Sequence, residues 1–416
     1  MSLRERLTIV CLSSQPWQDG MWTNKQHIMS RLAREHRVYY VSFGPNPLPA
    51  LVRKKLAHET PLRSPVGAVL DPVRYEQAGV TVLEFLSPRA FVRKKPASHP
   101  FSIYANFDLR LELLGRFLAR EGVENPVIWV YHPGYGAKVR ELPHRLIVYD
   151  CVDEYTEFPT YKADPGWLIE REAALAAVAD VVTTTSAGLY ERKRPLNPAR
   201  THLVHNVGDF EHFSRARAES TRVPDDLARL PRPVIGFLGA VSDYKLHADW
   251  LTALARRHRE YSIVLVGPVG VGDPTTDVSV LRAEPNVHLL GHRAYELLPG
   301  YVKGFDLGVI PYRINEYTTY SFPIKFFELL ASGKPLVISE LPALRDYYAA
   351  ARVARSADEF VSACEAALAD PMAGCAERLK LASENTWEHR VERILVHVER
   401  ALAEKSAVPG ARAGSV

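Results

Sequence analysis

Short, uninterrupted apolar runs recur along the chain and alternate with segments of helical periodicity. The first run, residues 7–12, is followed by a helical segment that opens at Thr23 and by a second run at 37–43. Runs without polar alternation are typical of strands that are covered on both faces. The alternation therefore predicts a parallel sheet with helices on both sides. We expect further strands at 80–86, 127–131, 146–149, 180–184 and 201–204, and helices near 108–120, 165–179 and 186–194.

The same alternation starts again after a polar, proline-bounded segment, and a chain of 416 residues is long enough for two cores. We therefore predict an α/β fold of two facing Rossmann-like, doubly wound domains. Their expected bounds are 1–208 and 234–385, with a linker at 209–233, a last helix at 386–404 and a disordered tail at 405–416. Strands are expected at 234–239, 262–267, 286–291, 306–311 and 335–339, with helices near 247–259, 295–303 and 357–368.

Composition and charge exclude several classes of protein. The formal net charge of +4 is too small for general nucleic-acid binding. Cys11, Cys151, Cys364 and Cys375 have neither metal-ligand nor disulfide-framework spacing, so we expect reduced thiols in a cytoplasmic protein. The apolar run near the N-terminus, about seven residues, is too short for a signal peptide or a membrane span.

Two basic triplets, at 53–55 and 93–95, lie in or near a proline-rich region of the first half. Charge runs of this kind are usually solvated loops. The alternative is a basic rim that meets an anionic acceptor or a membrane surface.

Several predicted strands end in glycine, as at Gly239, Gly267 and Gly291. Ligands of doubly wound sheets bind beyond the carboxyl ends of strands, and a residue without Cβ allows close approach. The alternative is a tight turn into the next helix. No G-x-G-x-x-G follows the first strand, and Gly333-Lys334 lacks the upstream glycine of a phosphate-binding loop, which disfavours dinucleotide and P-loop sites. Gly333 is better explained as a helix C-cap.

The stretch S-F-P-I-K-F-F-E-L-L, residues 321–330, is mostly apolar but contains two charges. Ser321 and Pro323 predict a helix N-terminus, where anions bind favourably. Lys325 would add a cation for a diphosphate, and Glu328, on the same face, a carboxylate for the hydroxyls of a ribose. The alternative is an i,i+3 ion pair on a solvated face, but the neighbouring apolar residues leave little solvated surface. The pattern therefore favours a nucleotide site.

Three segments of the second half, GFLGAVSD, VHLLGHRAYELLPGYVKGFDLGVIPY and SFPIKFFELLASGKPLV, resemble the donor domain of GT-B glycosyltransferases. Among these they are most similar to the retaining family-four enzymes of cell-surface polysaccharide assembly. A looser likeness extends to VYDCVDEYTEFP and LVHNVGDFEHF in the first half. The helix from Trp387 resembles the last helix of that family, which crosses back to the first domain.

The resemblance implies transfer of a sugar from a nucleotide-diphosphate donor on the second domain to an acceptor on the first, with neither metal nor cofactor. It assigns the ribose to Glu328, the diphosphate to Lys325 and the helix start, and the base to the loop at His292 and Arg293. The donor residues it implies are Gly239, Lys245, His292, Arg293, Ser321, Phe322, Pro323, Ile324, Lys325 and Glu328.

The chain departs from the family pattern in three places. Tyr320 stands where relatives usually have a second glutamate, and Glu316 is the nearest upstream carboxylate. Ala240 stands where an arginine often follows the glycine, so Lys245 is our substitute phosphate cation. The third departure is the order H-N-V-G-D at 205–209 in place of the commoner N-G-V-D.

On the acceptor side, His132 precedes Pro133 and resembles the His-x-Pro position that lines the cleft in some relatives. A purely structural histidine is the alternative. Asp153 follows a strand, where a carboxylate can orient or deprotonate an acceptor hydroxyl. Asp150 and Asp153 without a third ligand are weak evidence for a metal. Asp19 and Gly20 occupy the loop that contacts acceptor or phosphate in relatives.

The leading hypothesis is thus a hexosyl-type glycosyltransferase with catalytic candidates Lys325, Glu328, His132 and Asp153. One alternative is a non-hydrolysing sugar-nucleotide epimerase, which binds the same donor without an acceptor. The other is a degenerate nucleotide-sugar-binding scaffold, which the changes at Tyr320 and Ala240 keep open. The expected partners are a nucleotide-sugar donor, a glycan, lipid-linked or small-molecule acceptor, and an anionic membrane at its inner face, but no nucleic acid.

Overall fold

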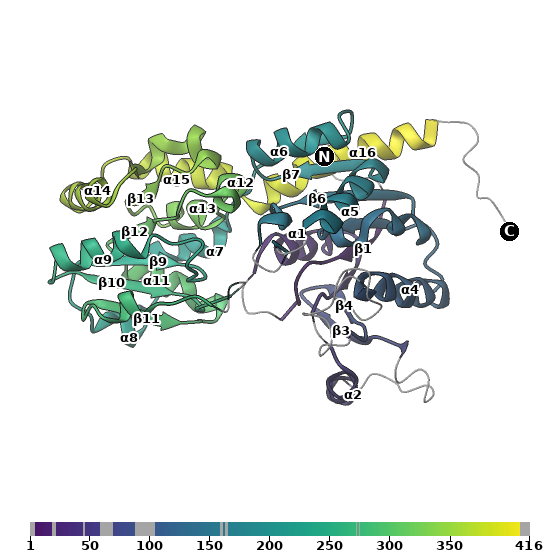
Figure 1. Cartoon of the computed structure of the whole chain (residues 1–416), viewed down its shortest axis with the longest axis horizontal. Helices are drawn as coiled ribbons and strands as arrows, with labels where there is room; N and C mark the ends of the chain where they lie inside the picture. The colour runs from purple at the N-terminus through teal and green to yellow at the C-terminus, as the bar shows by residue number, and fades with distance from the viewer. Residues whose placement is uncertain are drawn as a thin grey trace.

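The computed structural model describes residues 5–18, 22–44, 46–58, 70–87, 105–158, 161–162, 165–271, 273 and 275–407. They form two lobes that lie side by side, each built on its own β-sheet (Figure 1). The first lobe has an eight-stranded sheet and the second a six-stranded sheet. The predicted α/β architecture with two mainly parallel sheets is confirmed.

The first sheet has the strand order β3-β4-β2-β1-β5-β6-β7-β8, and every neighbouring pair is parallel except β3–β4 at the edge. Its strands are β1 (Thr8–Leu12), β2 (Arg37–Val41), β3 (Val73–Gln77), β4 (Val80–Glu84), β5 (Val127–Val130), β6 (Leu146–Cys151), β7 (Val181–Thr184) and β8 (Thr201–Leu203). All but β3 were predicted. The sequence of β3 is largely polar and exposed, so it carries no signal of a covered strand.

Helices α1 (Asn24–Leu32), α4 (Ala105–Arg120), α5 (Pro165–Val178) and α6 (Ala187–Lys193) connect these strands. The sheet has an apolar cluster on each face. Ile9 and Cys11 of β1 belong to one cluster, and Val10 and Leu12 belong to the other. Both sides of the strand are therefore covered, which is why its sequence is apolar without alternation.

The second sheet is entirely parallel, with the order β11-β10-β9-β12-β13-β14. Its strands are β9 (Val234–Leu238), β10 (Ser262–Val266), β11 (Val287–Gly291), β12 (Leu307–Ile310), β13 (Leu336–Ser339) and β14 (Arg352–Ala354). Helices α9 (Ala248–Arg257), α11 (Leu298–Gly304) and α14 (Ala357–Ala369) lie where helices were predicted. The short β14, α10 (Ser279–Arg282) and α15 (Cys375–Glu384) were not predicted.

The segment 209–233, predicted as a linker, is folded onto the second lobe rather than forming an exposed connection. It contains α7 (Phe210–Ser214) and α8 (Asp225–Ala228). Phe213, Ala216 and Leu227 are buried in the same apolar cluster as β9 and α11. These apolar residues are spaced too widely among polar neighbours to show as a periodic stripe.

The last helix, α16 (Trp387–Ala407), crosses from the second lobe back along the first (Figure 1). Trp387, Ile394 and Val398 are buried in a core cluster of the first lobe. Arg390 is fully buried and pairs with Asp150 of β6 at 2.9 Å. The helix extends to Ala407, so the predicted tail began too early, and residues 408–416 lie outside the described part.

The two basic triplets have different outcomes. Residues 53–55 lie in α2 (Leu48–Ala57), not in a solvated loop, and Lys55 is only 1% exposed. Residues 93–95 lie outside the described residues. The four cysteines are free thiols, as predicted. Within the described part of the chain, no helix combines the length and apolar character that crossing a membrane requires.

Candidate functional site

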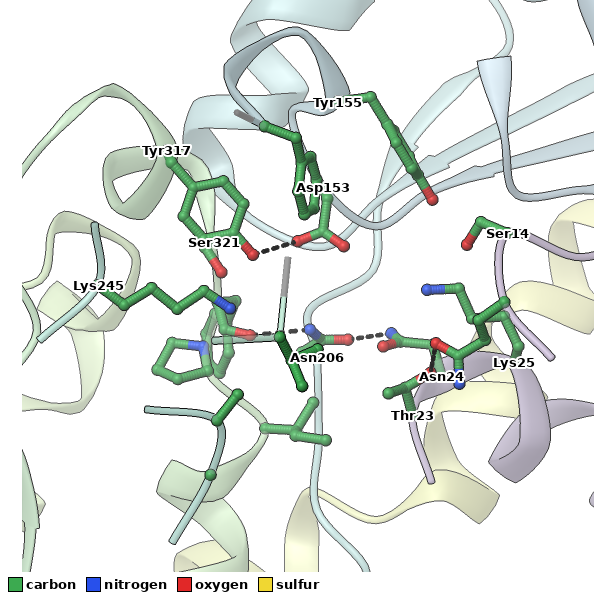
Figure 2. Close-up of a pocket in the computed structure, with 18 of the residues that line it drawn as sticks. Ser14, Thr23, Asn24, Lys25, Asp153, Tyr155, Asn206, Lys245, Tyr317 and Ser321 are labelled. Carbon is green, nitrogen blue, oxygen red and sulfur yellow. Dashed lines mark hydrogen bonds between the residues drawn. The ribbon is translucent and has the colours of Figure 1, made fainter. Parts of the chain in front are cut away.

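A cavity of about 410 Å³ lies between the two lobes, at the carboxyl ends of strands from both sheets. Figure 2 shows its charged and hydroxyl side chains converging from both sides. The first lobe contributes Ser14, Gln15, Trp22, Thr23, Asn24, Lys25, His132, Asp153, Tyr155, Phe158, Tyr161 and Asn206. The second lobe contributes Gly239, Ala240, Lys245, Val271, Tyr312, Tyr317, Ser321, Phe322, Pro323, Ile324 and Lys325.

The predicted start of the helix at Ser321 and Pro323 is wrong. Ser321 is the C-cap of α12 (Glu316–Tyr320), and α13 runs from Lys325 to Leu330 with Ile324 as its N-cap. The proline interrupts the path, so the apolar stretch divides into the end of one helix and the start of another. Residues 321–324 nevertheless line the cavity.

Lys325 and Glu328 form the predicted pair one turn apart. Lys325 Nζ lies 2.6 Å from Glu328 Oε2, and the Glu328 side chain is fully buried. Burial raises the pKa of Glu328, and Lys325 lowers it. Glu328 Oε1 has no hydrogen-bond partner among the described residues. The pair is therefore not the solvated ion pair of the alternative reading, and one buried carboxylate oxygen is left without a donor.

Lys245 reaches into the cavity from the loop after β9 (Figure 2). Its Nζ lies 5.2 Å and 5.0 Å from the ring centroids of Tyr244 and Tyr317, and no ion pair to a described residue accompanies these contacts. Burial lowers its pKa, and Asp153 raises it. Ala240 lies beside it in the cavity wall, so the loop has a lysine available where the arginine is missing.

The strand-end glycines approach one another closely. Gly239 and Gly267 have φ values of 148° and 154°, and a Cβ on Gly267 would lie 1.8 Å from the Gly239 carbonyl oxygen. They line a second cavity of about 30 Å³ together with His292, Arg293 and Lys325. The Arg293 guanidinium donates to Asp226 at 2.9 Å and to the Tyr301 hydroxyl at 2.7 Å. This small space is beside the predicted base-binding loop.

Tyr320, which replaces the family glutamate, points at the first lobe. Its ring would contact a Cβ on Gly188 at 2.9 Å, and the Arg192 guanidinium lies 5.2 Å from its centroid. Its carbonyl accepts a hydrogen bond from the Ser186 hydroxyl at 2.6 Å. Glu316 is exposed on α12, with Lys162 Nζ at 3.9 Å. Neither residue lines the cavity.

The sequence reading missed Lys25, in the first turn of α1. Only 5% of it is exposed, yet it lines the cavity, and its amine points toward Asp153 and Lys245 (Figure 2). It lies 5.6 Å from the centroid of the Tyr131 ring. The apolar stripe at Ile28, Met29 and Leu32 indicates the core-facing side of the helix. No pattern in the neighbouring sequence indicates that Lys25 lines a cavity.

Asp153 connects the two lobes. Its Oδ1 accepts a hydrogen bond from the Tyr317 hydroxyl of α12 at 3.2 Å. Burial raises the pKa of Asp153, while Lys25 and Lys245 lower it. Asp150 has a structural role, because it accepts hydrogen bonds from Arg390 and Thr183 at 2.9 Å and 2.8 Å. In the described residues, no group of three or more His, Cys, Asp or Glu side chains could hold a metal.

His132 lines the cavity, but both ring nitrogens have partners. Nδ1 accepts from the Gly134 amide at 3.0 Å, so the proton belongs on Nε2, which lies 2.8 Å from the Tyr161 hydroxyl. Burial lowers its pKa to about 3. A neutral histidine with both nitrogens occupied positions its neighbours and does not accept a proton. The candidates Asp19 and Gly20 lie outside the described residues.

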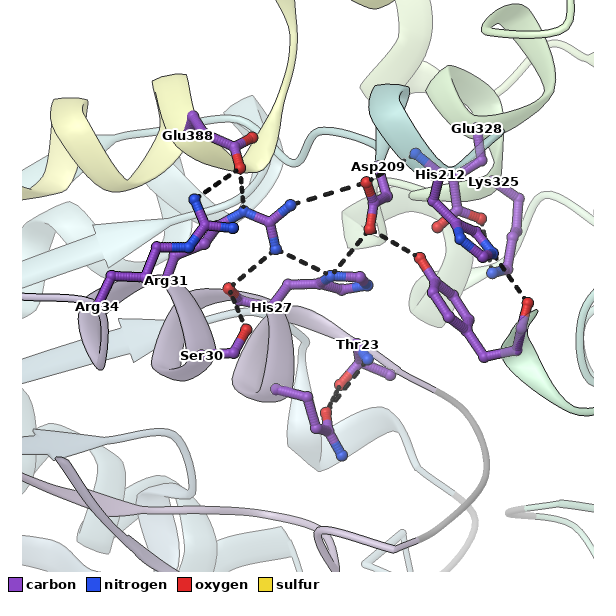
Figure 3. Close-up of polar contacts among 12 residues, drawn as sticks. Thr23, His27, Ser30, Arg31, Arg34, Asp209, His212, Lys325, Glu328 and Glu388 are labelled. Atoms are coloured by element: carbon purple, nitrogen blue, oxygen red, sulfur yellow. Dashed lines mark hydrogen bonds and ion pairs between the residues drawn. The ribbon is translucent and has the colours of Figure 1, made fainter. Parts of the chain in front are cut away.

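A polar network holds the lobes together beside the cavity (Figure 3). Arg31 of α1 lies 2.7 Å from Glu388 of α16 and 3.7 Å from Asp209. Asp209 also accepts from the Tyr295 hydroxyl at 3.0 Å. Tyr295 stacks on Trp22 of the first lobe, with centroids 5.8 Å apart. Trp22 and Tyr295 both line the small cavity beside the loop at His292 and Arg293.

The unusual order at 205–209 has a packing reason. A Cβ on Gly208 would lie 2.8 Å from the Glu328 amide nitrogen, so glycine allows α13 to approach this segment. Asn206 accepts a hydrogen bond from Asn24 and donates to the Phe322 carbonyl at 2.9 Å. The H-N-V-G-D segment therefore ties α1 to the segment 321–324 of the cavity wall (Figure 2).

Comparison with known proteins shows that the second lobe is similar to a known family. Residues 232–370 match the family Glycosyl transferases group 1, a match that runs from just before β9 to the end of α14. Over 230 residues, the chain is 26% identical to TuaH of Bacillus subtilis (strain 168), which is named as a teichuronic acid biosynthesis glycosyltransferase. That alignment covers 53% of this chain and 56% of TuaH, so the chain spans about half the length of the curated relative it matches.

Solved structures resemble the whole chain. Sucrose-phosphate synthase of Thermosynechococcus elongatus has a TM-score of 0.67 at 16% identity and covers 96% of this chain and 100% of its own. Anabaena HepE in complex with UDP has a TM-score of 0.63 at 14% identity, with coverages of 95% and 100%. A Burkholderia xenovorans α,α-trehalose-phosphate synthase in complex with glucose-6-phosphate has 0.65 at 12%, again with 95% and 100%. The likeness shows the GT-B fold.

Proposed function

We propose that this GT-B protein, whose second lobe matches the group 1 glycosyl transferases, moves a sugar from a nucleotide-diphosphate donor to an acceptor in the first lobe. The observation that carries the proposal is the convergence of Lys25, Lys245 and Lys325 on one cavity between the lobes. Buried cations are costly unless an anion compensates them. A donor diphosphate would compensate Lys245 and Lys325.

Lys245 and Lys325 are the residues that we assign to the diphosphate. As the sugar leaves, negative charge gathers on the diphosphate, and fixed cations stabilise it without rearrangement. The glycine pair at the ends of β9 and β10 leaves no side chain between the backbone and this charge. Removal of one such donor from a preorganised site typically slows a reaction about 10²–10³-fold.

Glu328 is assigned to the ribose. Its orphan Oε1 is a buried acceptor that a sugar hydroxyl would satisfy. Glu328 does not line either cavity in this structure, since Lys325 lies over it at 2.6 Å. Donor binding therefore requires Lys325 to turn from Glu328 toward the diphosphate. The base would enter beside His292 and Arg293, where the stack of Trp22 and Tyr295 must open.

Asp153 is assigned to the acceptor hydroxyl. It lies on the first-lobe side of the cavity with a pKa that burial raises, which makes the carboxylate a better proton acceptor than an exposed one. His132 is a positioning residue in this scheme, because its nitrogens hold the Gly134 amide and Tyr161. The resemblance to family-four enzymes supports retention at the anomeric carbon.

We expect turnover without a metal, because the lysines supply the positive charge that a metal would otherwise bring to the diphosphate. Turnover that survives EDTA supports this reading. Restoration of an EDTA-treated enzyme by Mg²⁺ or Mn²⁺ contradicts it.

The test begins with thermal unfolding of the full chain in UDP, GDP, ADP, CDP and dTDP. A ligand that binds only the folded state raises the unfolding temperature with its concentration. Lys245→Gln should weaken the best nucleotide about tenfold, the effect of one lost charge-assisted hydrogen bond. Lys162→Gln is the matched control, since that lysine is 61% exposed. No stabilisation by any of the five nucleotides would sink the proposal.

Turnover separates the two alternative functions. Epimerisation of the donor without any acceptor identifies an epimerase. Tight nucleotide binding with neither donor hydrolysis nor transfer identifies a scaffold. Slow donor hydrolysis that a suitable acceptor converts into transfer supports the glycosyltransferase.

The acceptor is proposed to be a glycan, free or lipid-linked, used at the inner face of the cell membrane by a cytoplasmic protein. Helix α2 supports a membrane contact, because Leu48 and Leu56 are 43% and 67% exposed beside the exposed Arg53. It protrudes below the first lobe, next to β3 (Figure 1). Leu56→Glu should reduce co-sedimentation with anionic vesicles. Co-sedimentation that depends on neither anionic lipid nor salt contradicts the contact.

A further inference from the structure

The N-terminal turn of α1 faces the acceptor side of the cavity. Thr23, in extended conformation, is the N-cap of this nine-residue helix, and Thr23, Asn24 and Lys25 all line the cavity. The first amides of a helix lack intrahelical partners and carry partial positive charge. Asn24 is tied to Asn206, which donates to the Phe322 carbonyl of the second lobe. The turn is thus held in place at the edge of the donor site.

Lys25 is a second and independent sign of an anion at this turn. It is 5% exposed, and its ammonium group makes neither a hydrogen bond nor an ion pair with any described residue. Its Nζ lies 5.6 Å from the centroid of the Tyr131 ring. Burial lowers its pKa, while Asp153, Asp150 and Cys11 raise it. A buried ammonium that has no ion pair is costly unless a ligand brings a negative group.

The acidic side chains that act on Lys25 already have other partners, so an anionic ligand can still bind the lysine. Asp150 is already paired with Arg390 at 2.9 Å, and Asp153 accepts from Tyr317 at 3.2 Å. On its own helix, α1 has no acidic residue in the first turn. Lys245 enters the cavity from the opposite side, so a donor diphosphate held there lies across the cavity from Lys25 (Figure 2).

We propose that the acceptor carries an anionic group, a phosphate or a carboxylate, which binds Lys25 and the amides at the start of α1 that the capping box of Thr23 and Gln26 leaves free. The inference rests on the proposed glycosyl transfer and names the chemical class of its acceptor. Tyr155, Phe158 and Tyr161 line the same side and offer ring faces to a sugar. Asp153 then lies between the acceptor anion and the donor, where it can receive the proton of the attacking hydroxyl.

The test measures anion binding to the full chain when the donor site is already filled. The protein is saturated with the nucleoside diphosphate that stabilises it best, and then titrated with inorganic phosphate, glucose 6-phosphate, glucuronate or neutral glucose. We expect the wild type to gain thermal stability with at least one anion and none with glucose. A response to glucose 6-phosphate but not to glucuronate identifies a phosphate site, and the reverse identifies a carboxylate site.

Variants at position 25 assign the effect. Lys25→Gln should weaken the anion about tenfold, the effect of one charge-assisted hydrogen bond, while the nucleotide dissociation constant changes less than about threefold. Lys25→Arg keeps the charge and should retain most of the anion response, which also guards against a folding defect in the glutamine variant. Lys245→Gln should show the opposite pattern, with weaker nucleotide and unchanged anion.

Failure of this inference is distinct from failure of the proposed function. If a nucleotide stabilises the protein but no anion adds to it, the acceptor is not held by an anionic group, whereas glycosyl transfer survives. An anion response that persists in Lys25→Gln also overturns the assignment. If Lys25→Gln weakens the nucleotide and not the anion, Lys25 belongs to the donor site. If no nucleotide binds, the proposed function itself is wrong.

Discussion

Helices α1 and α13 face the same cavity from opposite lobes, and each begins with a lysine in its first turn. Lys325 of α13 has a carboxylate one turn later, with Glu328 Oε2 at 2.6 Å. Lys25 of α1 is followed by Gln26, and its helix has no acidic first turn. The two lysines thus share a position but not a counterion.

This difference determines which ligand each helix can accept. On α13, a ligand must satisfy both a cation and the orphan Glu328 oxygen, so it needs an anionic group next to hydroxyl groups. A nucleotide has both. On α1, Lys25 forms no ion pair with a described residue, and only the general attraction of Asp153 and Asp150 favours its charge. There an anion alone suffices. The two sides of the cavity therefore differ in the kind of ligand that they can bind. Substitution of each charged residue tests this difference.

The largest effect is expected at Glu328. Glu328→Gln keeps the shape but removes the counterion of Lys325 and the charge that accepts the ribose hydroxyls. We expect kcat/KM for the donor to fall about 10³-fold. Glu316→Gln is the control, because that side chain is exposed on α12. A Glu328→Gln enzyme within threefold of the wild type would show that the pair on α13 has no part in donor use.

The next effect is expected at Asp153, between the two lysines. Asp153→Asn should lower kcat about 10²-fold if this carboxylate takes the acceptor proton. Because burial raises its pKa, wild-type activity should be lost as the pH falls through that raised value and the carboxylate becomes protonated. The acid limb of the pH–kcat profile should be absent in Asp153→Asn. A limb that remains assigns the titration to another group.

The contrast between the helices also explains what the sequence could predict. Lys325 and Glu328 are neighbours on one helix, so their spacing alone indicated the pair. The alternation of apolar runs predicted nearly all the strands, since covered strands have few polar residues. These features are local, and their signal lies within about ten residues.

Features that depend on distant segments were missed. Lys25 became a cavity residue only because Asn206 and Asp153, more than a hundred residues away in sequence, pack around the start of α1. Ser321 was mistaken for an N-cap because the end of α12 depends on packing against α6. The burial of 209–233 depends on its contacts with α11. Local propensity does not report such contacts.

The same substitution at the two lysines should have opposite effects on stability. Lys325→Met leaves Glu328 buried without its cation, and removal of one partner from a buried pair is destabilising. The side chain of Lys325 is 17% exposed, so we expect a moderate loss of about 2 kcal/mol, a fall in unfolding temperature of about 4–8 °C. Thermal unfolding without ligand measures this. An unchanged unfolding temperature would mean that Glu328 is neutral in the free protein.

Lys25→Met should have the smallest effect and the opposite sign. The methionine keeps much of the apolar stem and removes a buried charge that lacks a counterion among the described residues, so the free protein should gain about 1 kcal/mol, or about 2–4 °C.

The gain depends on pH, since burial lowers the pKa of Lys25 in the folded protein. Below that lowered pKa the wild type carries the full penalty. As the pH rises through it toward the ordinary lysine value, the folded state loses the proton and the penalty disappears. The variant should therefore gain most at neutral pH and little near pH 10. A destabilised Lys25→Met at neutral pH would mean that Lys25 has a counterion after all, and α1 and α13 would then be alike.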